Sequence, residues 1–310
     1  MTLLPPTVEL QRRIDEEMAP DPEARKRDVA ALREWLSKQP HLPKHMDDKR
    51  LEHFLFSCKN SLERCKMRLE IYFSARTALP EFFSDRDPMG RDIQDCCDNV
   101  EYLVCPKMTD DGHRVTILRL KETDIDKFSL VAVSKRITMI LDLRLLEEPN
   151  LSNVMVIDLK GFTAAHFAKC VPAQPSVKKA MLAIQNAMPF RLHSVHYLHS
   201  PSFVSNVINL FYPLLKKKLT EKFFVHTGGG EDLSKFMNRD ILPNEYGGKA
   251  GSFQELNEAW RLKLEKHRDW FLRDEKISRT DESKRLPNSK CLINDELAGL
   301  QGSFRKLNID

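Results

Sequence analysis

Three histidines spaced by three residues, with a serine after the first and after the last, are the strongest candidates for chemistry: His193, His196 and His199. In a strand, His193 and His199 would face one side and His196 the other, so the three could not share a metal ion without a bend. A carboxylate that could complete a zinc site or orient a catalytic triad is missing nearby, because Asp158 belongs to another predicted strand. We therefore expect packed or hydrogen-bonded histidines.

Other catalytic signatures are incomplete. The glycine run within residues 227–230 is followed by Glu-Asp-Leu, so it lacks the Gly-Lys-Ser/Thr of a phosphate-binding loop. No GxGxxG opens a helix after a strand, and no GxSxG marks a hydrolase nucleophile. A grouping of Cys96, Cys97, Cys105 and His113 is a weaker candidate still. The sequence predicts a protein that is not an enzyme and needs no cofactor or metal.

The composition is that of an ordinary folded protein. Of 310 residues, 41% are hydrophobic and 30% charged, with a formal net charge of +4. These values allow a sizeable core, exclude a disordered or low-complexity chain, and do not by themselves imply nucleic acid as a partner. No run of 18 apolar residues could span a bilayer, and the first 15 residues do not resemble a secretory signal. Seven scattered cysteines without a CxxC pair favour reduced thiols in the cytoplasm.

Residue periodicity predicts helices first and an α/β segment afterwards. Within residues 8–79, helical spacing indicates one helix through Trp35 that ends at Pro40, one capped by Asp47, and one that starts near residue 60. Helical stretches near 128–146, 175–188 and 201–220 then alternate with short strands at 102–105, 115–120, 154–159, 195–198 and 223–226. This alternation predicts a mostly parallel sheet.

We expect three parts along the chain. Residues 1–85 should form a helical domain and residues 86–250 an α/β domain. The third part, residues 251–310, should contain one amphipathic helix over 251–270 and then a charged tail beyond Arg273, which either stays solvated or packs back through Leu297, Leu300 and Phe304.

The most informative stretch is residues 192–215, which contain no Asp, Glu, Lys or Arg. Within them we name residues 200–215 the lid segment, in which Ser200 should cap a helix and Pro201 should be its first residue. One face of this helix is apolar. The other face is polar but uncharged and consists of Ser202, Ser205, Asn206 and Asn209. A helix at a water surface usually carries charged residues on that face.

A basic cluster follows the lid segment directly. Lys216, Lys217, Lys218 and Lys222 come after it, and Arg191 precedes it. The apolar face of the lid segment carries seven large side chains. Their full burial would contribute on the order of 10–20 kcal/mol of favourable free energy, so they must cover a core, an apolar ligand or a membrane. Each basic residue would add roughly 1 kcal/mol against an anionic leaflet. A core helix followed by a solvated lysine turn explains the same pattern.

At these residues the chain resembles the CRAL-TRIO lipid-transfer family, over about residues 25–270. The resemblance depends on ordered motifs, each weak alone: residues 51–64, Asp111–Leu120, Val156–Gly161, Met188–Arg191, His196, Ser200-Pro201, Tyr212–Leu215, His226–Gly228 and Leu242–Gly248. It implies a helical N-terminal domain and an α/β lipid-binding domain whose sheet floors an apolar cavity under a mobile lid helix.

The resemblance also implies binding residues. A family basic patch that binds phosphoinositide headgroups matches Arg191, His193, Lys218 and Lys222 here, with Lys217 adjacent, although another of its positions falls near Cys58, with Lys59 adjacent. Phosphatidylinositol-transferring members carry a Glu where this chain has Phe190, which favours the tocopherol and retinoid branch. The expected cavity residues are Met139, Ile157, Ile184, Met188, Phe190, Phe203, Val207 and Phe211.

Two functions are compatible with these features. The first is intracellular binding and transfer of a hydrophobic small lipid of the tocopherol, retinoid or carotenoid class, with the lid opening at phosphoinositide-containing membranes. The alternative is a phosphoinositide-dependent adaptor or signalling module without net lipid transfer. In both, the partners are a hydrophobic small molecule and a peripheral membrane surface, not nucleic acid, and the protein is cytoplasmic and transiently membrane-associated.

Overall fold

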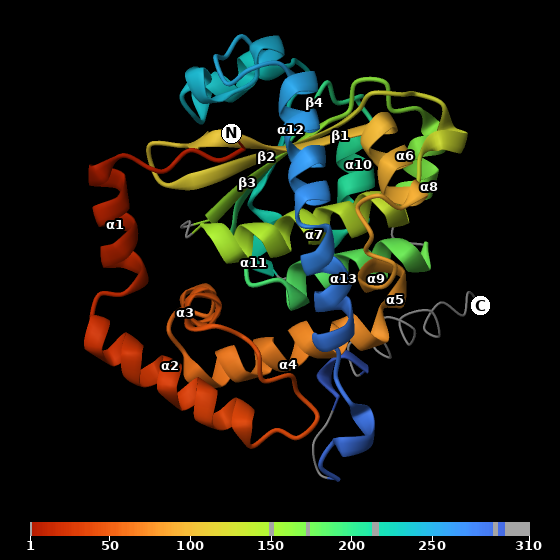
Figure 1. The fold of residues 1–310 in the computed structure, drawn as a ribbon. Coiled ribbons are helices and arrows are strands. Elements are labelled where there is room, and N and C mark those ends of the chain that lie inside the picture. The colour runs from red at the N-terminus through yellow and green to blue at the C-terminus, as the bar shows by residue number, and fades with distance from the viewer. Residues whose placement is uncertain (1, 149–151, 172–173, 213–216, 288–290, 295–310) are drawn as a thin grey trace, which may run out of the picture.

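A computed structural model describes residues 2–148, 152–171, 174–212, 217–287 and 291–294. The N-terminal part is helical, as predicted (Figure 1), with α1 (Val8–Met18), α2 (Pro22–Ser37), α3 (Asp48–Ser57) and α4 (Leu62–Ala78). The predicted cap of α3 is confirmed, because the Asp47 side chain accepts a hydrogen bond from the Arg50 backbone amide. Two short helices follow that we did not predict, α5 (Pro80–Phe83) and α6 (Arg91–Asn99).

A five-stranded sheet forms the centre of the molecule, in the order β1-β2-β3-β4-β5. Its strands match the predicted runs: β1 (Val100–Met108), β2 (His113–Leu120), β3 (Ser152–Asp158), β4 (Leu192–Leu198) and β5 (Phe223–Val225). Strands β1 and β2 form an antiparallel hairpin, and every later pair is parallel. The mixed α/β fold with a mostly parallel sheet is therefore confirmed.

Helices cover the sheet and connect its parallel strands. Helix α7 (Leu130–Glu147) joins β2 to β3, and the β3–β4 connection contains α8 (Ala164–Cys170), α9 (Pro175–Leu182) and a π-helical turn at Ala183–Ala187. Between β4 and β5 lie α10 (Val204–Asn209) and α11 (Lys217–Thr220). None of the helices within the described ranges is long and apolar enough to cross a membrane.

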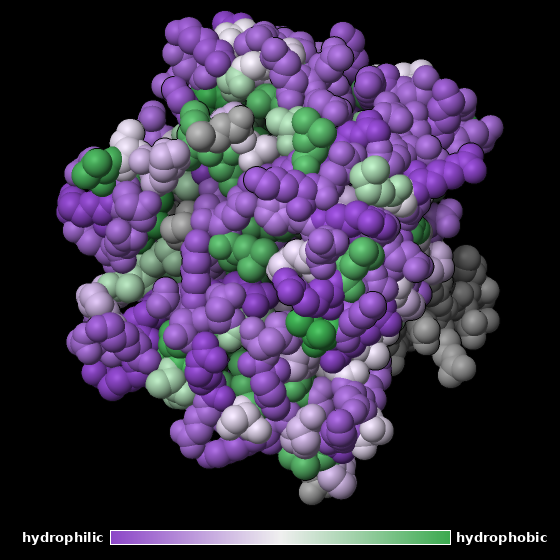
Figure 2. Space-filling model, viewed as in Figure 1, coloured by the Kyte–Doolittle hydropathy of each residue, from purple (hydrophilic) through white to green (hydrophobic). Residues whose placement is uncertain are grey.

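The C-terminal part contains two helices where we predicted one. Helix α12 (Phe253–Lys266) ends at His267, and α13 (Arg268–Ile277) continues in a column that leads from the sheet to the N-terminal helices (Figure 1). On α12, Trp260 is fully buried and its indole donates to the Val104 carbonyl (3.1 Å). The face that carries α12 is mostly hydrophilic, with scattered small hydrophobic patches (Figure 2).

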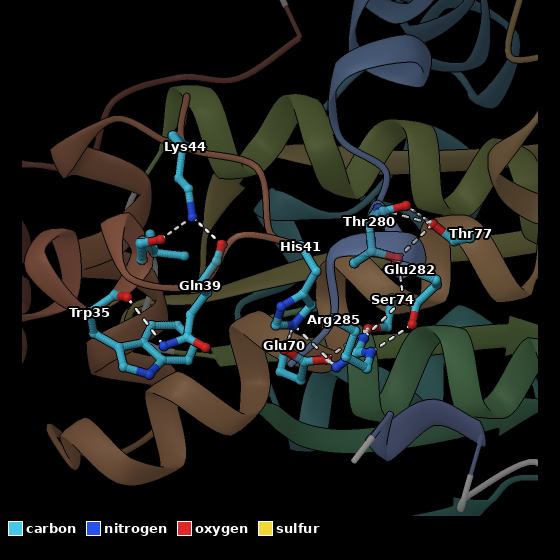
Figure 3. A network of polar contacts seen from close by, with 11 residues as sticks. Trp35, Gln39, His41, Lys44, Glu70, Ser74, Thr77, Thr280, Glu282 and Arg285 are labelled. Atoms are coloured by element: carbon cyan, nitrogen blue, oxygen red, sulfur yellow. Dashed lines mark hydrogen bonds and ion pairs between the residues drawn. The ribbon is translucent and has the colours of Figure 1, made fainter. Parts of the chain in front are cut away.

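The prediction of a solvated tail beyond Arg273 holds only in part, because residues 281–284 and 286–287 are exposed but other residues of this segment pack on the N-terminal helices. Leu297, Leu300 and Phe304 lie outside the described residues. Arg285 reaches the N-terminal helices (Figure 3), where its Nη1 lies 2.6 Å from Glu70 Oε1 and its Nη2 donates to Ser74 Oγ. The Thr280 hydroxyl donates to Thr77 Oγ1 (2.9 Å), and His41 Nε2 lies 2.9 Å from Glu70 Oε2. Arg285 and Thr280 thus bond to partners that lie some 200 residues earlier in the chain, while Asp281 and Lys284 pair with each other.

Candidate functional site

One face of the sheet is incompletely covered, although it lies beneath helices. On the central strand β3, Val154 and Val156 are buried at 2% and 0% exposure, whereas Met155 and Ile157 are only partly buried. Strand register aligns Met155 and Ile157 with Thr116 and Leu118 on β2, and with Val195 and Tyr197 on β4. Because alternate residues point to opposite faces, these side chains share one face. Thr116, Leu118 and Val195 of this face are buried, so its partly exposed positions are Met155, Ile157 and Tyr197.

The lid segment packs over the same face. Val204 and Ile208 of α10 are buried in an apolar cluster with Leu159 and Phe167, and Ile157, Tyr197, Val207 and Phe223 pack against this cluster. The Phe203 ring lies 5.0 Å from the Phe167 ring but remains 43% exposed. Helix α10 therefore packs on this face of the sheet through Val204 and Ile208, while its exposed residues are polar: Ser205, Asn206 and Asn209.

The start of this helix differs from the prediction. Helix α10 begins at Val204, so Ser200 does not cap it, and Pro201 is not its first residue. Ser200 is instead held at the end of the sheet, because its amide donates to the His226 carbonyl (2.9 Å) and its hydroxyl to the Tyr197 carbonyl (3.1 Å). The described helix has six residues, and residues 213–216 of the lid segment lie outside the described ranges.

Asp158 does reach a histidine, contrary to the expectation from sequence. Asp158 Oδ1 lies 2.6 Å from His199 Nδ1, and Asp158 Oδ2 accepts a hydrogen bond from the Tyr246 hydroxyl (2.6 Å). We call Asp158, His199 and Tyr246 the Asp158 network. It ties the ends of β3 and β4 to residues 244–246 at the point where the chain leaves the sheet for the lid segment. The Asp158 carboxylate and the Tyr246 side chain are buried. The pKa of Tyr246 is therefore raised, mainly by burial and to a smaller extent by the negative charge of Asp158.

The glycine run packs against this network and has a structural role there. His199 has a positive φ of 48°, and its amide donates to the Gly228 carbonyl (2.8 Å). A Cβ at Gly229 would lie 2.8 Å from the His199 ring, and one at Gly230 would lie 2.2 Å from Tyr246 Cβ. These glycines allow the loop to approach the network closely. No group of three metal-ligating side chains occurs among the residues that the structure describes.

We expect the Tyr246→Phe variant to lose about 1.5–3 kcal/mol of unfolding free energy, because it leaves Asp158 Oδ2 buried without its donor. The measurement is urea unfolding at pH 7. The control is Tyr212→Phe on the lid segment, whose side chain is 38% exposed, and its effect should stay within about 0.5 kcal/mol. Equal effects of the two variants would contradict a stabilising role for the Asp158 network.

The other two histidines of the triplet have separate neighbours. His196 is buried, with Nδ1 3.0 Å from His226 Nε2 and Nε2 2.9 Å from Ser194 Oγ. Burial first, and then the neighbouring histidines, lower the pKa of His196 to about 4. His193 is exposed and stacks on His113 with 4.0 Å between ring centres. The three histidines therefore occupy three environments and form no joint metal site.

The structure does not bring all of the predicted cavity residues together. Ile157 and Val207 lie against the lid cluster, whereas Met139 and Met188 are fully buried in the main core, with Ile184 and Phe190 packed against it. Phe211 is partly buried and Phe203 exposed. Sequence reasoning missed Met155, Tyr197 and Phe167, although alternation on the predicted strands could have found Met155 and Tyr197.

The predicted basic residues gather near the starts of β4 and β5. The Lys222 ammonium donates to the Leu192 carbonyl, and burial lowers the pKa of Lys222. Arg191 is half buried: its guanidinium donates to the Phe56 carbonyl, lies over the Phe56 ring, and is 3.6 Å from Glu17. The side chains of Lys217 and Lys218 lie outside the described part of the chain.

A small cleft lies beside Arg191, between α3, the end of α7 and the entry to β4. Polar and apolar groups both line it: His53, Phe56, Ser57, Leu145, Glu148, Pro189, Phe190 and Arg191. The pKa of His53 is lowered to about 4, mainly by burial and to a smaller extent by the positive charge of Lys49. This cleft lies at the opposite end of β4 from the start of the lid segment.

Stability should fall as the pH drops below about 6.5, because His53 is neutral in the fold and protonates readily when unfolded. Its folded pKa lies below its unfolded value, so its contribution is complete above about pH 6.5 and is lost toward pH 4. Between pH 6 and pH 5, the His53 contribution to the slope of unfolding free energy should approach 1.4 kcal/mol per pH unit. Urea unfolding of His53→Gln should show a shallower slope, and an unchanged slope would contradict this assignment.

Comparisons with known proteins agree with the geometry. Residues 21–93 match the family model "Pinta-like, UBA domain", and residues 99–248 match "CRAL/TRIO domain". The chain is 30% identical over 275 residues to the alpha-tocopherol transfer protein-like proteins of Homo sapiens and Pongo abelii, covering 86% of this chain and 78% of those proteins.

Two further likenesses are more distant. Clavesin-2 of Homo sapiens is 26% identical over 140 residues, which cover 44% of this chain and 42% of that protein. The crystal structure of Sfh5 has a TM-score of 0.46 and 14% sequence identity, and covers 87% of this chain and 100% of that one.

Proposed function

Because the chain belongs to the CRAL/TRIO family, whose members bind and transfer small lipophilic ligands, we propose that it carries a hydrophobic small lipid of the tocopherol, retinoid or carotenoid class. The ligand lies between the lid segment and the sheet face that carries Met155 and Ile157. It is held by burial of apolar surface, without covalent chemistry.

The partial burial of Met155 and Ile157 is the observation that carries this proposal. Both sit on a central strand, where a filled α/β core would bury them fully, as it buries Val154 and Val156. Phe190, at the position where a headgroup-binding carboxylate would favour phosphatidylinositol, is partly buried and lies 5.1 Å from the Arg144 guanidinium. An aromatic side chain there favours a lipid without a large polar headgroup.

Delivery takes place at a membrane that contains phosphoinositides. The outer side of the lid segment exposes Phe203, Leu210 and Tyr212, which can enter the interface when the segment swings away from the sheet. The nearby basic residues attract anionic headgroups: Arg191, His193, Lys217, Lys218 and Lys222. Opening the lid at this surface lets the ligand pass into the bilayer.

Organic extraction of the purified protein, followed by mass spectrometry, tests the ligand class. We expect an isoprenoid-type lipid at close to one molecule per chain, and recovery of diacyl phospholipids alone would overturn the assignment. Transfer is tested with donor and acceptor vesicles, the acceptors with or without 5% phosphatidylinositol bisphosphate. Binding to the acceptor vesicles without movement of tocopherol or retinol between vesicles would favour the adaptor function instead.

A further inference from the structure

Helix α1 packs on the rest of the protein through a small apolar cluster of its own. Its apolar face consists of Leu10, Ile14 and Met18. These side chains are buried together with Phe56 of α3 and Met108 of β1, in a cluster separate from the main core. The helix stands at one side of the molecule, between the sheet and α2 (Figure 1). An isolated helix of 11 residues is marginally stable in water, so α1 depends on this cluster.

The last turn of α1 carries three acidic residues, Asp15, Glu16 and Glu17, and no basic one. The C-terminal end of a helix bears partial negative charge, so acidic side chains there destabilise the isolated helix. Two of the three have partners on α1 itself. Asp15 accepts a hydrogen bond from the Gln11 amide group (2.7 Å), and Glu16 forms an exposed ion pair with Arg12. Glu17 has its partner on another element.

The partner of Glu17 is Arg191, at the entry to β4. Glu17 Oε1 lies 3.6 Å from Arg191 Nη1, which is too long for a hydrogen bond. Arg191 Nη2 donates to the Phe56 carbonyl, and the guanidinium lies 3.7 Å from the centre of the Phe56 ring. Arg191 Nε is buried without a hydrogen-bond partner among the residues that the structure describes. Helix α1 and Arg191 therefore pack on the same aromatic residue, and the guanidinium is incompletely paired.

A phosphate group would pair with this guanidinium better than Glu17 does. Arginine binds phosphate through two parallel N–H···O bonds, whereas the contact with Glu17 is a single long ion pair. Glu17 stands beside the Nη1 atom that such a phosphate would bind, and its negative charge repels the phosphate. A phosphate can therefore reach Arg191 fully only when Glu17 moves away, and Glu17 moves with α1.

We propose that α1 is an autoinhibitory helix: Glu17 occupies the place of an anionic lipid headgroup beside Arg191, and a phosphoinositide displaces the helix when the protein docks on a membrane. This role of α1 rests on the proposed function, in which Arg191 is one of the residues that attract anionic headgroups. The movement is local, because both ends of the segment stay attached. The Leu4 amide donates to the Pro106 carbonyl (2.8 Å), and α2 follows directly after residues 19–21.

Sedimentation with vesicles of phosphatidylcholine and 5% phosphatidylinositol bisphosphate tests this role in the full chain. Glu17→Gln removes the charge beside Arg191, and the matched control Glu16→Gln removes an equal charge that pairs with Arg12. At low salt we expect about fivefold tighter binding for Glu17→Gln, because one opposing charge leaves the docking surface, and less than about twofold for the control. Neither variant should gain binding to phosphatidylcholine alone. The Glu17 side chain is half exposed, so its replacement should not disturb folding.

Amide hydrogen exchange measures the movement of the helix itself. In the wild-type protein, the amides of residues 11–18 should exchange at least about tenfold faster when vesicles with phosphatidylinositol bisphosphate bind, and should stay protected with phosphatidylcholine vesicles. Ile14→Asp places a charge in the buried cluster, so it should release α1 without any vesicle. This variant should bind the vesicles at least as tightly as Glu17→Gln, and combining the two changes should add little.

The outcomes distinguish failure of this role from failure of the proposed function. Equal vesicle binding by the wild type, Glu17→Gln and Glu16→Gln would overturn autoinhibition and leave the proposed function standing, as would α1 amides that stay protected in the vesicle-bound protein. Binding by Glu17→Gln or Ile14→Asp but not by the wild type would support complete inhibition. Absence of binding by every variant would overturn phosphoinositide docking itself, and the role of α1 with it.

Discussion

Replacing Asp142 with alanine should lower the free energy of unfolding by about 3–5 kcal/mol, because it leaves two buried arginines without their shared anion. Asp142 on α7 is 1% exposed, with Oδ1 2.7 Å from Arg76 Nη2 and Oδ2 2.6 Å from Arg86 Nη2. The Tyr72 hydroxyl also donates to Oδ1 (3.1 Å). Burial alone would raise the pKa of Asp142, but the two arginines lower it below its ordinary value, so the charged form is bound in the fold.

Urea unfolding at pH 7 measures this effect. Asp240→Ala is the matched control, because it removes an ion pair to Lys249 in which both side chains are at least half exposed, and its cost should stay under about 1 kcal/mol. Replacing the three residues with hydrophobic ones and the second partner of Arg86 with its amide, Asp142→Leu, Arg76→Met, Arg86→Met and Asp274→Asn, should restore most of the loss. A loss below about 1 kcal/mol for Asp142→Ala would show that solvent reaches this cluster in the folded protein.

The elements of the fold could be predicted because each is encoded by its own neighbouring residues. Asp47 marks the start of α3 because its carboxylate reaches an amide three residues later, and the runs that became β2 and β3 are rich in β-branched residues. Helices α5 and α6 were missed because they are short, four and nine residues, so neither shows a long apolar periodicity.

The Asp158 network could not be predicted because it depends on how distant strands align. Asp158 faces Leu198 in the parallel pairing of β3 with β4, and that register places His199 beside the carboxylate. A long crossover of helices connects the two strands, so the local sequence does not determine their alignment. The general rule that functional groups collect at the carboxyl ends of parallel strands was the available signal. The partners of Arg285 on α4 could not be predicted either, because they also lie far away in the sequence.

The geometry also explains why one short segment can both seal and release a ligand. The lid segment is anchored at its start, where Ser200 bonds to the sheet and His199 to Asp158. Beyond that anchor, the contacts of the described residues that hold α10 are the apolar ones of Val204 and Ile208. Apolar contacts can be exchanged for equivalent contacts with lipid tails at little cost in free energy. The polar hydrogen bonds of the anchor have no such replacement in lipid, so they remain in place. Opening is therefore expected to pivot about residues 199–203.

Reversing two lysines, Lys218→Glu with Lys222→Glu, should weaken binding to vesicles that contain phosphatidylinositol bisphosphate by roughly a thousandfold. Each lysine contributes about 1 kcal/mol at an anionic surface, and each reversal costs about twice that, so the sum is about 4 kcal/mol. Ligand capacity should not change, because neither position belongs to the proposed cavity. Vesicle sedimentation at low salt measures binding, and transfer between vesicles should slow in parallel.

The control carries the same charge change on α2. Lys26 and Lys38 are exposed and pair only within that helix, with Glu23 and Glu34 respectively in the contacts described, so Lys26→Glu with Lys38→Glu alters net charge equally. If binding depends on the cluster near β5, the control should lose less than about tenfold, and 0.5 M salt should remove most of the difference between the two variants. Equal losses would mean that net charge, not this cluster, attracts the protein to the membrane. Because Lys222 also bonds to the Leu192 carbonyl, thermal unfolding of both variants must show that each is folded at the assay temperature.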